Sequence, residues 1–154
     1  MASAPAIAYD AERAQETVEL IETIGATGLT GLLGITIRDY SAGRFVTELA
    51  LRDQLMLAAG NLLHAGTALT LADTTAGWGC LVNLPAGIGG FTTIEGKANF
   101  LATARSHDVL TCTAVLLHGG RTTQVWDAEV RRSADDRLVS SYRCTQSLIE
   151  QARN

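Results

Sequence analysis

The alternation of apolar and polar positions divides the chain into a helical start, a long apolar centre and a strand-rich second half. Residues 9–25 carry apolar side chains at helical spacing among Asp, Glu and Arg, which predicts an amphipathic helix. Residues 32–40 and 44–51 alternate as two strands joined by a turn at Ser41-Ala42-Gly43. Residues 53–63 are expected to form the loop that leads into the apolar centre.

The apolar centre predicts a helix over residues 64–82 that is hydrophobic on nearly every side. Such a helix must be wrapped by a sheet or covered by a second subunit. The rest of the chain predicts four strands with short connections, which form an antiparallel meander. These strands are expected at residues 91–101, 109–118, 122–132 and 138–148.

Asp73 is the one charged residue between Gln54 and Ile94. Removing a carboxylate from water costs on the order of several kcal/mol unless partners compensate for the lost hydration. Asp73 is therefore either a structural acid with satisfied hydrogen bonds or a catalytic acid, and composition leaves both readings open.

Composition and charge narrow the class of protein. The chain has 154 residues, of which 47% are hydrophobic and 18% charged, as expected for one globular domain. A net charge of −4 argues against a nucleic-acid partner. Cys80, Cys112 and Cys144 form no paired motif, which favours reduced thiols and a cytoplasmic protein. Met1–Asp10 has no signal-peptide pattern, and the apolar centre is too interrupted for a membrane span.

The start of the apolar helix carries chemistry of its own. His64 and Asp73 are nine residues apart, which is about 13 Å of helical rise and half a turn out of phase. They cannot form a dyad within one continuous helix, so they act separately or a second subunit brings them together. The N–H groups of Ala65 and Gly66 lack helical partners and could bind an oxyanion. An ordinary entry into a helix explains these small residues equally well.

Other reaction types find little support in the sequence. There is no GxSxG motif, and three His residues without a spaced cluster predict no metal site. Arg105 and Arg121 are expected at corresponding ends of neighbouring strands, where they are either solvated surface charges or contacts to phosphate groups. Thr122, beside Arg121, is a further candidate for substrate binding.

Three segments in this order resemble the PaaI-like thioesterases, relatives of the 4-hydroxybenzoyl-CoA thioesterases in the hotdog superfamily. They are His64-Ala65-Gly66-x6-Asp73, Thr93–Leu101 and Gly120-Arg121-Thr122. The resemblance covers roughly residues 30 to 150 and implies an α+β hotdog fold, with a long central helix wrapped by an antiparallel sheet. It also implies a homodimer or homotetramer whose active sites are shared between subunits, so that the chemical partners of Asp73 lie in the neighbouring chain.

The same resemblance implies roles for individual residues. Asp73 matches the acid that attacks the thioester or activates water, and the Ala65 N–H matches the group that polarises the carbonyl. Thr93 matches an assisting hydroxyl, and Asn61 lies near a polar position before the motif. Some relatives instead carry a Thr one turn past the acid, where this chain has Gly77.

The prediction is an acyl-CoA thioesterase that needs no cofactor and acts on a CoA thioester, including an aryl-acyl one. Residues 1–29 are expected to be a helical lead-in and residues 30–154 the hotdog unit of a single domain. Two alternatives remain open: a hotdog enoyl-CoA hydratase or dehydratase, and an acyl-CoA-binding protein without catalysis.

Overall fold

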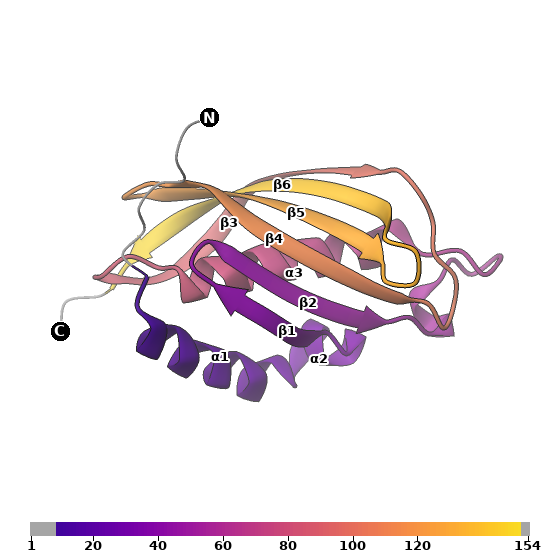
Figure 1. Cartoon of the computed structure of the whole chain (residues 1–154), viewed down its shortest axis with the longest axis horizontal. Coiled ribbons are helices and arrows are strands. Elements are labelled where there is room, and N and C mark those ends of the chain that lie inside the picture. The colour runs from indigo at the N-terminus through magenta and orange to yellow at the C-terminus, as the bar shows by residue number, and fades with distance from the viewer. Residues whose placement is uncertain (1–8, 152–154) are drawn as a thin grey trace.

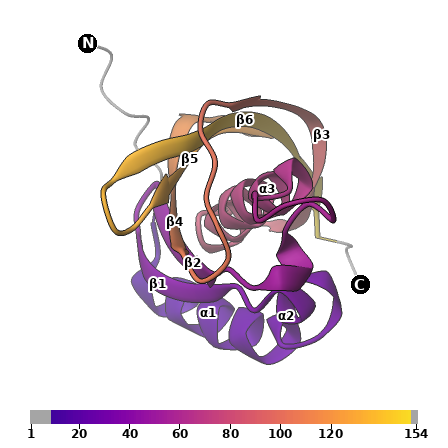
Figure 2. The same ribbon diagram turned by 90° about the vertical axis from the view of Figure 1, so that its right-hand side faces the viewer.

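One antiparallel sheet curls around a single long helix (Figure 1, Figure 2). The structure, a computed structural model, describes residues 9–151. The strands follow the order β1-β2-β4-β5-β6-β3 across the sheet. The helices are α1 (Ala11–Gly25), α2 (Gly28–Leu33) and α3 (Ala65–Val82), with a short 3-10 helix at Asp53–Leu55. The strands are β1 (Thr36–Ser41), β2 (Arg44–Ala50), β3 (Ile88–Phe100), β4 (Val109–Gly119), β5 (Thr123–Arg132) and β6 (Arg137–Glu150). This confirms the predicted α+β architecture.

Two predictions concern residues partly beyond this range. The signal-peptide assessment of Met1–Asp10 rests mainly on residues 1–8, which lie outside the described residues. The outer ends of the predicted units 1–29 and 30–154 do so as well.

Helix α3 is the centre of the core because its sequence is apolar almost all round. Leu71, Ala72 and Ala76 are fully buried, and the helix contacts α1 as well as β2 to β6. Gly79 allows a close approach to the sheet, since a Cβ there would lie 2.9 Å from the ring of Trp126. The predicted wrapping of this helix is therefore confirmed. None of the helices within residues 9–151 combines the length and apolar character that crossing a membrane requires.

Helix α1 closes the side of α3 that the sheet leaves open, below β1 and β2 in Figure 2. Asp10 caps the helix by accepting hydrogen bonds from the N–H groups of Glu12 and Arg13. The buried face contributes Ala14, Val18 and Ile21, which pack with Phe45 and Val82. The amphipathic helix expected from the sequence is thus present.

The predicted strand at residues 32–40 is wrong at its start. Residues 28–33 form α2, and the chain becomes extended only at Thr36. Gly34 ends the helix in a left-handed conformation with φ 79°, which glycine adopts without steric cost. The Thr30 hydroxyl supports this turn by donating to the Gly25 carbonyl at 2.9 Å. Apolar residues in a single helical turn cannot be told from a strand by their pattern alone.

Strand β3 is the edge of the sheet beside α3. It pairs only with β6 among the described residues, and the pairing slips at a bulge between Thr93 and Glu95. The bulge interrupts the alternation of side chains between the two faces of the strand. Ile94 and Phe100 on this strand are 60% and 48% exposed. A long edge strand with exposed apolar side chains is suited to pairing with another chain.

Candidate active site

Asp73 lies in the middle of α3 and faces β3 and β6, where it is half-buried. Its Oδ1 atom accepts a hydrogen bond from the Tyr142 hydroxyl at 2.8 Å. The Thr93 hydroxyl lies 3.4 Å from the same oxygen. The other oxygen, Oδ2, accepts no hydrogen bond from the described residues. The carboxylate is therefore held on one side and open on the other.

The groups around Asp73 stay neutral at physiological pH. Burial and the hydrogen bond to Asp73 raise the pKa of the Tyr142 phenol well above its usual range. Burial and the nearby Asp73 charge raise the pKa of the Cys144 thiol to about 11. Behind them, the Gln146 amide oxygen lies 2.9 Å from the Thr93 hydroxyl. Asp73 thus lies among neutral hydrogen-bond donors. None of the seven ion pairs found in the described residues includes Asp73.

Asp73 has two hydrogen-bonding neighbours in its own chain, Tyr142 and Thr93. The expectation that its chemical partners lie in another subunit stays a prediction. Tyr142 and Gln146 were not singled out from the sequence. The alternation of side chains along β6 could have indicated them, because both lie with Cys144 on the inward face of this strand. A Gln on such a face is a buried polar group that needs a hydrogen-bond partner. The partner itself could not be read from the sequence.

The position one turn past Asp73 is filled from the sheet. A Cβ at Gly77 would lie 2.9 Å from the tip of the Phe91 ring, so the ring occupies the space where some relatives carry a Thr side chain. A hydroxyl-bearing residue at 77 would need Phe91 to move. This leaves Thr93 and Tyr142 as the hydroxyl groups beside Asp73.

The start of α3 presents one open N–H group instead of the two expected. His64 is the N-cap, and its Nδ1 atom accepts a hydrogen bond from the Gly66 N–H at 2.9 Å. The Gly66 N–H is thereby occupied, which corrects its prediction as a free oxyanion donor. The Ala65 N–H has no acceptor among residues 9–151. Since the helix dipole adds partial positive charge at this end, Ala65 N–H is the better anion donor.

His64 is placed to stabilise the helix start, and this can be measured. The variant His64→Ala loses the cap and is expected to lower the free energy of unfolding by about 0.5–2 kcal/mol. The variant His64→Asn, which can cap through its side-chain oxygen, should retain most of the stability. Urea denaturation of the three proteins gives the comparison. Equal stability of the wild type and His64→Ala would show that the cap contributes nothing.

Helix α3 runs without interruption from Ala65 to Val82. His64 and Asp73 therefore remain about 13 Å apart along the axis, as nine helical residues require. The start of α3 and Asp73 of one chain therefore cannot contact the same reacting atom.

The two arginines predicted to bind phosphate lie at opposite ends of β4, not at corresponding ends of neighbouring strands. Arg105 precedes β4 and Arg121 follows it, so the full length of an 11-residue strand separates them. Near Arg105, the Asn61 side chain accepts a hydrogen bond from the Ser106 N–H at 2.6 Å. Asn61 and Arg105 thus lie near the start of α3, because the N–H of Leu63 also bonds the neighbouring loop at Ala104.

At the other end, Arg121 lines a pocket of about 460 Å³ together with the loop after α3. Glu150 lines the same pocket, and its negative charge weakens the attraction of Arg121 for an anion. Thr122 is exposed, and its carbonyl accepts a hydrogen bond from the Leu148 N–H at 2.9 Å. Neither Arg121 nor Thr122 forms a hydrogen bond with Asp73 among the described residues, where its donors are Thr93 and Tyr142.

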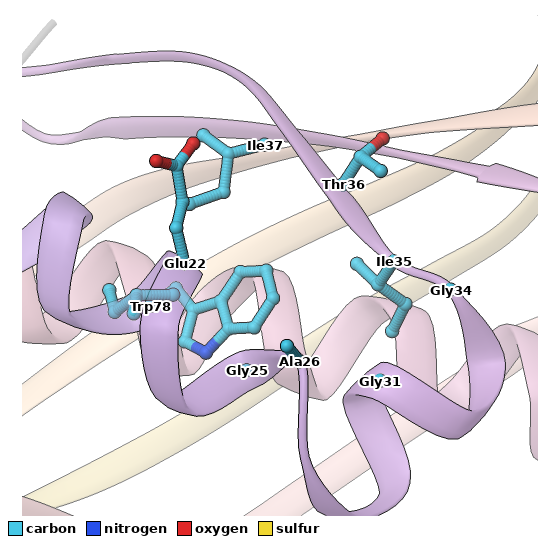
Figure 3. Close-up of a pocket in the computed structure, with 10 residues that line it drawn as sticks. Glu22, Gly25, Ala26, Gly31, Gly34, Ile35, Thr36, Ile37 and Trp78 are labelled. Atoms are coloured by element: carbon cyan, nitrogen blue, oxygen red, sulfur yellow. The ribbon is translucent and has the colours of Figure 1, made fainter.

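A second pocket, of about 500 Å³, lies between α1, α2, β1 and α3 (Figure 3). The Trp78 indole lies among its lining residues, with Glu22 and Ile35 on either side. Trp78 is five residues past Asp73 and so faces about 140° away from it around the helix. This pocket is separate from the carboxylate of the same chain.

Cysteine and metal chemistry have no visible site in residues 9–151. Cys80 and Cys112 are fully buried, and burial raises the pKa of the Cys112 thiol to about 12. Such thiols are protonated and poor nucleophiles. No group of three His, Cys, Asp or Glu residues in the described part of the chain could hold a metal ion.

Comparison with known proteins agrees with this architecture. The chain is similar to the PaaI protein of the E. coli phenylacetic acid degradation operon, at 23% identity and a TM-score of 0.81 over 92% of this chain and 96% of that one. A thioesterase from Haemophilus influenzae is 24% identical, with a TM-score of 0.79 over 88% and 92% of the two chains. A Streptococcus mutans protein solved with acetyl CoA bound is 21% identical, with a TM-score of 0.68 over 77% and 91%.

These similarities show the shared hotdog fold. No curated protein sequence matches the chain. The sequence profile of the thioesterase superfamily, however, matches residues 60–139, more than half of the chain, and this span runs from the loop before α3 into β6. It includes Asp73, Thr93 and the start of α3. The chain therefore belongs to the thioesterase superfamily.

Proposed function

We propose that this protein is an acyl-CoA thioesterase that hydrolyses a CoA thioester to the free acid and CoA, with Asp73 as the nucleophile or the general base. The observation that carries the proposal is the half-buried Asp73 carboxylate, held through Oδ1 and open at Oδ2. Family membership supports the reaction class. A carboxylate buried merely for structure would be expected to have both oxygens satisfied.

The chemistry follows from the open oxygen. As a general base, Oδ2 takes a proton from water while the water oxygen attacks the thioester carbonyl carbon. The carbon–sulfur bond then breaks, and the leaving thiolate takes the proton from Asp73. As a nucleophile, Oδ2 attacks the same carbon and displaces the thiolate, and water then hydrolyses the resulting anhydride. Both routes consume one water and release the same products.

The carbonyl oxygen becomes negative in either route and needs a donor. The Ala65 N–H at the start of α3 is open to such an anion. Because it is about 12 Å along the helix axis from Asp73 of the same chain, we assign this role to Ala65 of a second copy. The edge strand β3, with Ile94 and Phe100 exposed, offers the surface for pairing two chains. Two-fold symmetry then produces two equal sites per dimer, which a tetramer would retain.

The two candidate arginines for binding the CoA phosphates lie at opposite ends of β4. Arg105, near the start of α3, is the stronger candidate for a CoA phosphate in the site that Ala65 serves. Arg121 shares its pocket with Glu150 and is the weaker one. The Streptococcus mutans relative binds acetyl CoA, which supports a CoA thioester as substrate. The E. coli relative comes from the phenylacetic acid degradation operon, which keeps an aryl-acyl group among the substrates to be tested.

The proposed reaction is tested by thiol release from a panel of aryl-, short- and long-chain acyl-CoA thioesters. Hydrolysis of at least one member is expected, with turnover saturating in substrate. Consumption of enoyl-CoA without thiol release would instead identify a hydratase. Binding without turnover across the whole panel would identify a non-catalytic acyl-CoA-binding protein.

The shared site makes a separate prediction about mixed oligomers. Asp73→Asn and Ala65→Pro are each expected to be inactive alone. In a dimer with one chain of each kind, one site combines both defects and the other combines both native residues. Co-expression of the two variants should therefore restore about a quarter of the wild-type activity. Matched co-expression of Asp73→Asn with itself is the control. No recovery in mixed dimers of confirmed composition would place Asp73 and its oxyanion donor in one chain.

A further inference from the structure

We propose that Tyr142 is a positioning residue for Asp73: its hydroxyl holds Oδ1 and so reserves Oδ2 for the reaction. The inference rests on the proposed thioesterase function and adds a residue to the same site. Tyr142 lies on β6 and Asp73 on α3, and the hydrogen bond between them spans 2.8 Å. It connects the acid to the rigid sheet around it.

Tyr142 is the stronger of the two donors to Asp73. The Thr93 hydroxyl lies 3.4 Å from Oδ1 but only 2.9 Å from the Gln146 amide oxygen, and it has one proton to donate. The shorter contact takes that proton. The Tyr142 hydroxyl lies 2.8 Å from the Asp73 carboxylate, and the other acceptor near it, the Cys144 sulfur, is a weak one, so its proton goes to Asp73. Hydrogen bonds to a charged group are also shorter and stronger than neutral ones.

The chain leaves room for this phenol at one point on β3. A Cβ at Gly96 would lie 2.5 Å from the Tyr142 oxygen and 2.9 Å from the ring. Any side chain at position 96 would therefore displace the hydroxyl from Asp73. Tyr142 is only 4% exposed, so the ring is enclosed by its neighbours. Gly96 thus leaves free the space that the phenol occupies.

Enclosure explains how Tyr142 could act on the rate. A carboxylate at the end of a short side chain can rotate, and rotation would exchange the open and the held oxygen. Fixing one oxygen by a buried donor keeps the other in a single direction. A misplacement of about 1 Å in a reacting group can cost about 100-fold in rate. Because burial and the neighbouring Asp73 raise the pKa of the phenol, it stays a hydrogen-bond donor at physiological pH.

The test compares three variants in the thiol-release assay. Tyr142→Phe removes only the hydroxyl and is expected to lower kcat about 10- to 100-fold while KM changes less than about threefold. Gly96→Ala keeps the hydroxyl but moves it, and should lower kcat in the same direction. Tyr40→Phe is the matched control, because Tyr40 packs on Phe45 far along the sheet, and it should leave both constants unchanged. Wild-type kcat in Tyr142→Phe would overturn the proposal.

A double variant separates positioning from general stability. If Tyr142 acts through Asp73, adding Tyr142→Phe to Asp73→Asn should not lower the residual rate further. A structural role would instead lower both backgrounds by the same factor, and that result would also overturn the proposal.

An activity-free measurement keeps this inference distinct from the proposed function. The titratable groups that face the phenol are Asp73 from α3 and Cys144 from β6, while β3 and β5 present Ala98 and Ala128 there. The negative charge of Asp73 opposes ionisation of the phenol, so Asp73→Asn should move the Tyr142 titration to lower pH. Ultraviolet difference absorbance follows it, and Tyr142→Phe identifies the component. If Asp73→Asn leaves the Tyr142 titration unmoved, the contact between Tyr142 and Asp73 is overturned. If the titration moves but the wild type releases no thiol, only the proposed thioesterase function is overturned.

Discussion

Asp73→Asn is expected to reduce the kcat of thiol release about 100- to 10,000-fold, which is the contribution typical of a positioned general base. The amide keeps the shape of the carboxylate, and its oxygen can still accept the hydrogen bond from Tyr142. It can neither attack a thioester nor take a proton from water. Binding of the acyl-CoA should persist, since Asp73 is expected to contact only the reacting atoms. Turnover and calorimetric binding of a non-hydrolysable thioether analogue measure the two effects.

The matched control for this variant is Asp136→Asn. Asp136 has a positive φ of 55°, which Asn tolerates well, and it forms an exposed ion pair with Arg131. Turnover of this control should equal that of the wild type. Near-wild-type turnover in Asp73→Asn, with the oligomer intact, would remove Asp73 from the mechanism.

Ala65→Pro is expected to lower kcat about 100- to 1,000-fold, the usual effect of removing one oxyanion donor. Ala65 is the first residue of α3, where proline is well tolerated because that N–H has no partner within the helix. His64 already has φ −70° and ψ 129°, the extended conformation that a residue before proline adopts. The substitution therefore removes one hydrogen-bond donor and leaves the helix in place.

Two comparisons make the Ala65→Pro result specific. Ala65→Gly retains the N–H and should keep most of the activity. Thermal unfolding of both variants and the wild type should show similar midpoints. Loss of activity in Ala65→Pro with a preserved midpoint supports an oxyanion role. Full activity in Ala65→Pro would show that the carbonyl oxygen is stabilised elsewhere.

Local patterns were sufficient to predict most of the elements. The helix over residues 64–82 was predictable because it is long and its apolar character is continuous. The short helix α2 was missed, because its six residues are too few to show a helical repeat of apolar positions. The bulge in β3 was missed as well, because an extra residue in a ladder has no sequence period of its own.

The sequence likewise indicated some residues of the candidate site and not others. Asp73 stood out because a lone acid in an apolar helix is unusual in any sequence. The capping of Gly66 by His64 did not, because it depends on a side-chain rotamer. The separation of Arg105 and Arg121 was also misjudged. Their positions follow from the direction in which β4 runs through the sheet.

The sequence by itself determined the central helix, the strands that follow it and the acid in its middle, because each is a property of neighbouring residues. The tertiary structure alone decided which groups meet that acid. Tyr142 is 69 positions from Asp73 along the chain, and only the pairing of β3 with β6 around α3 brings them to 2.8 Å. Contacts of that kind depend on strand register, since a slip of one residue would turn Tyr142 to the opposite face of the sheet.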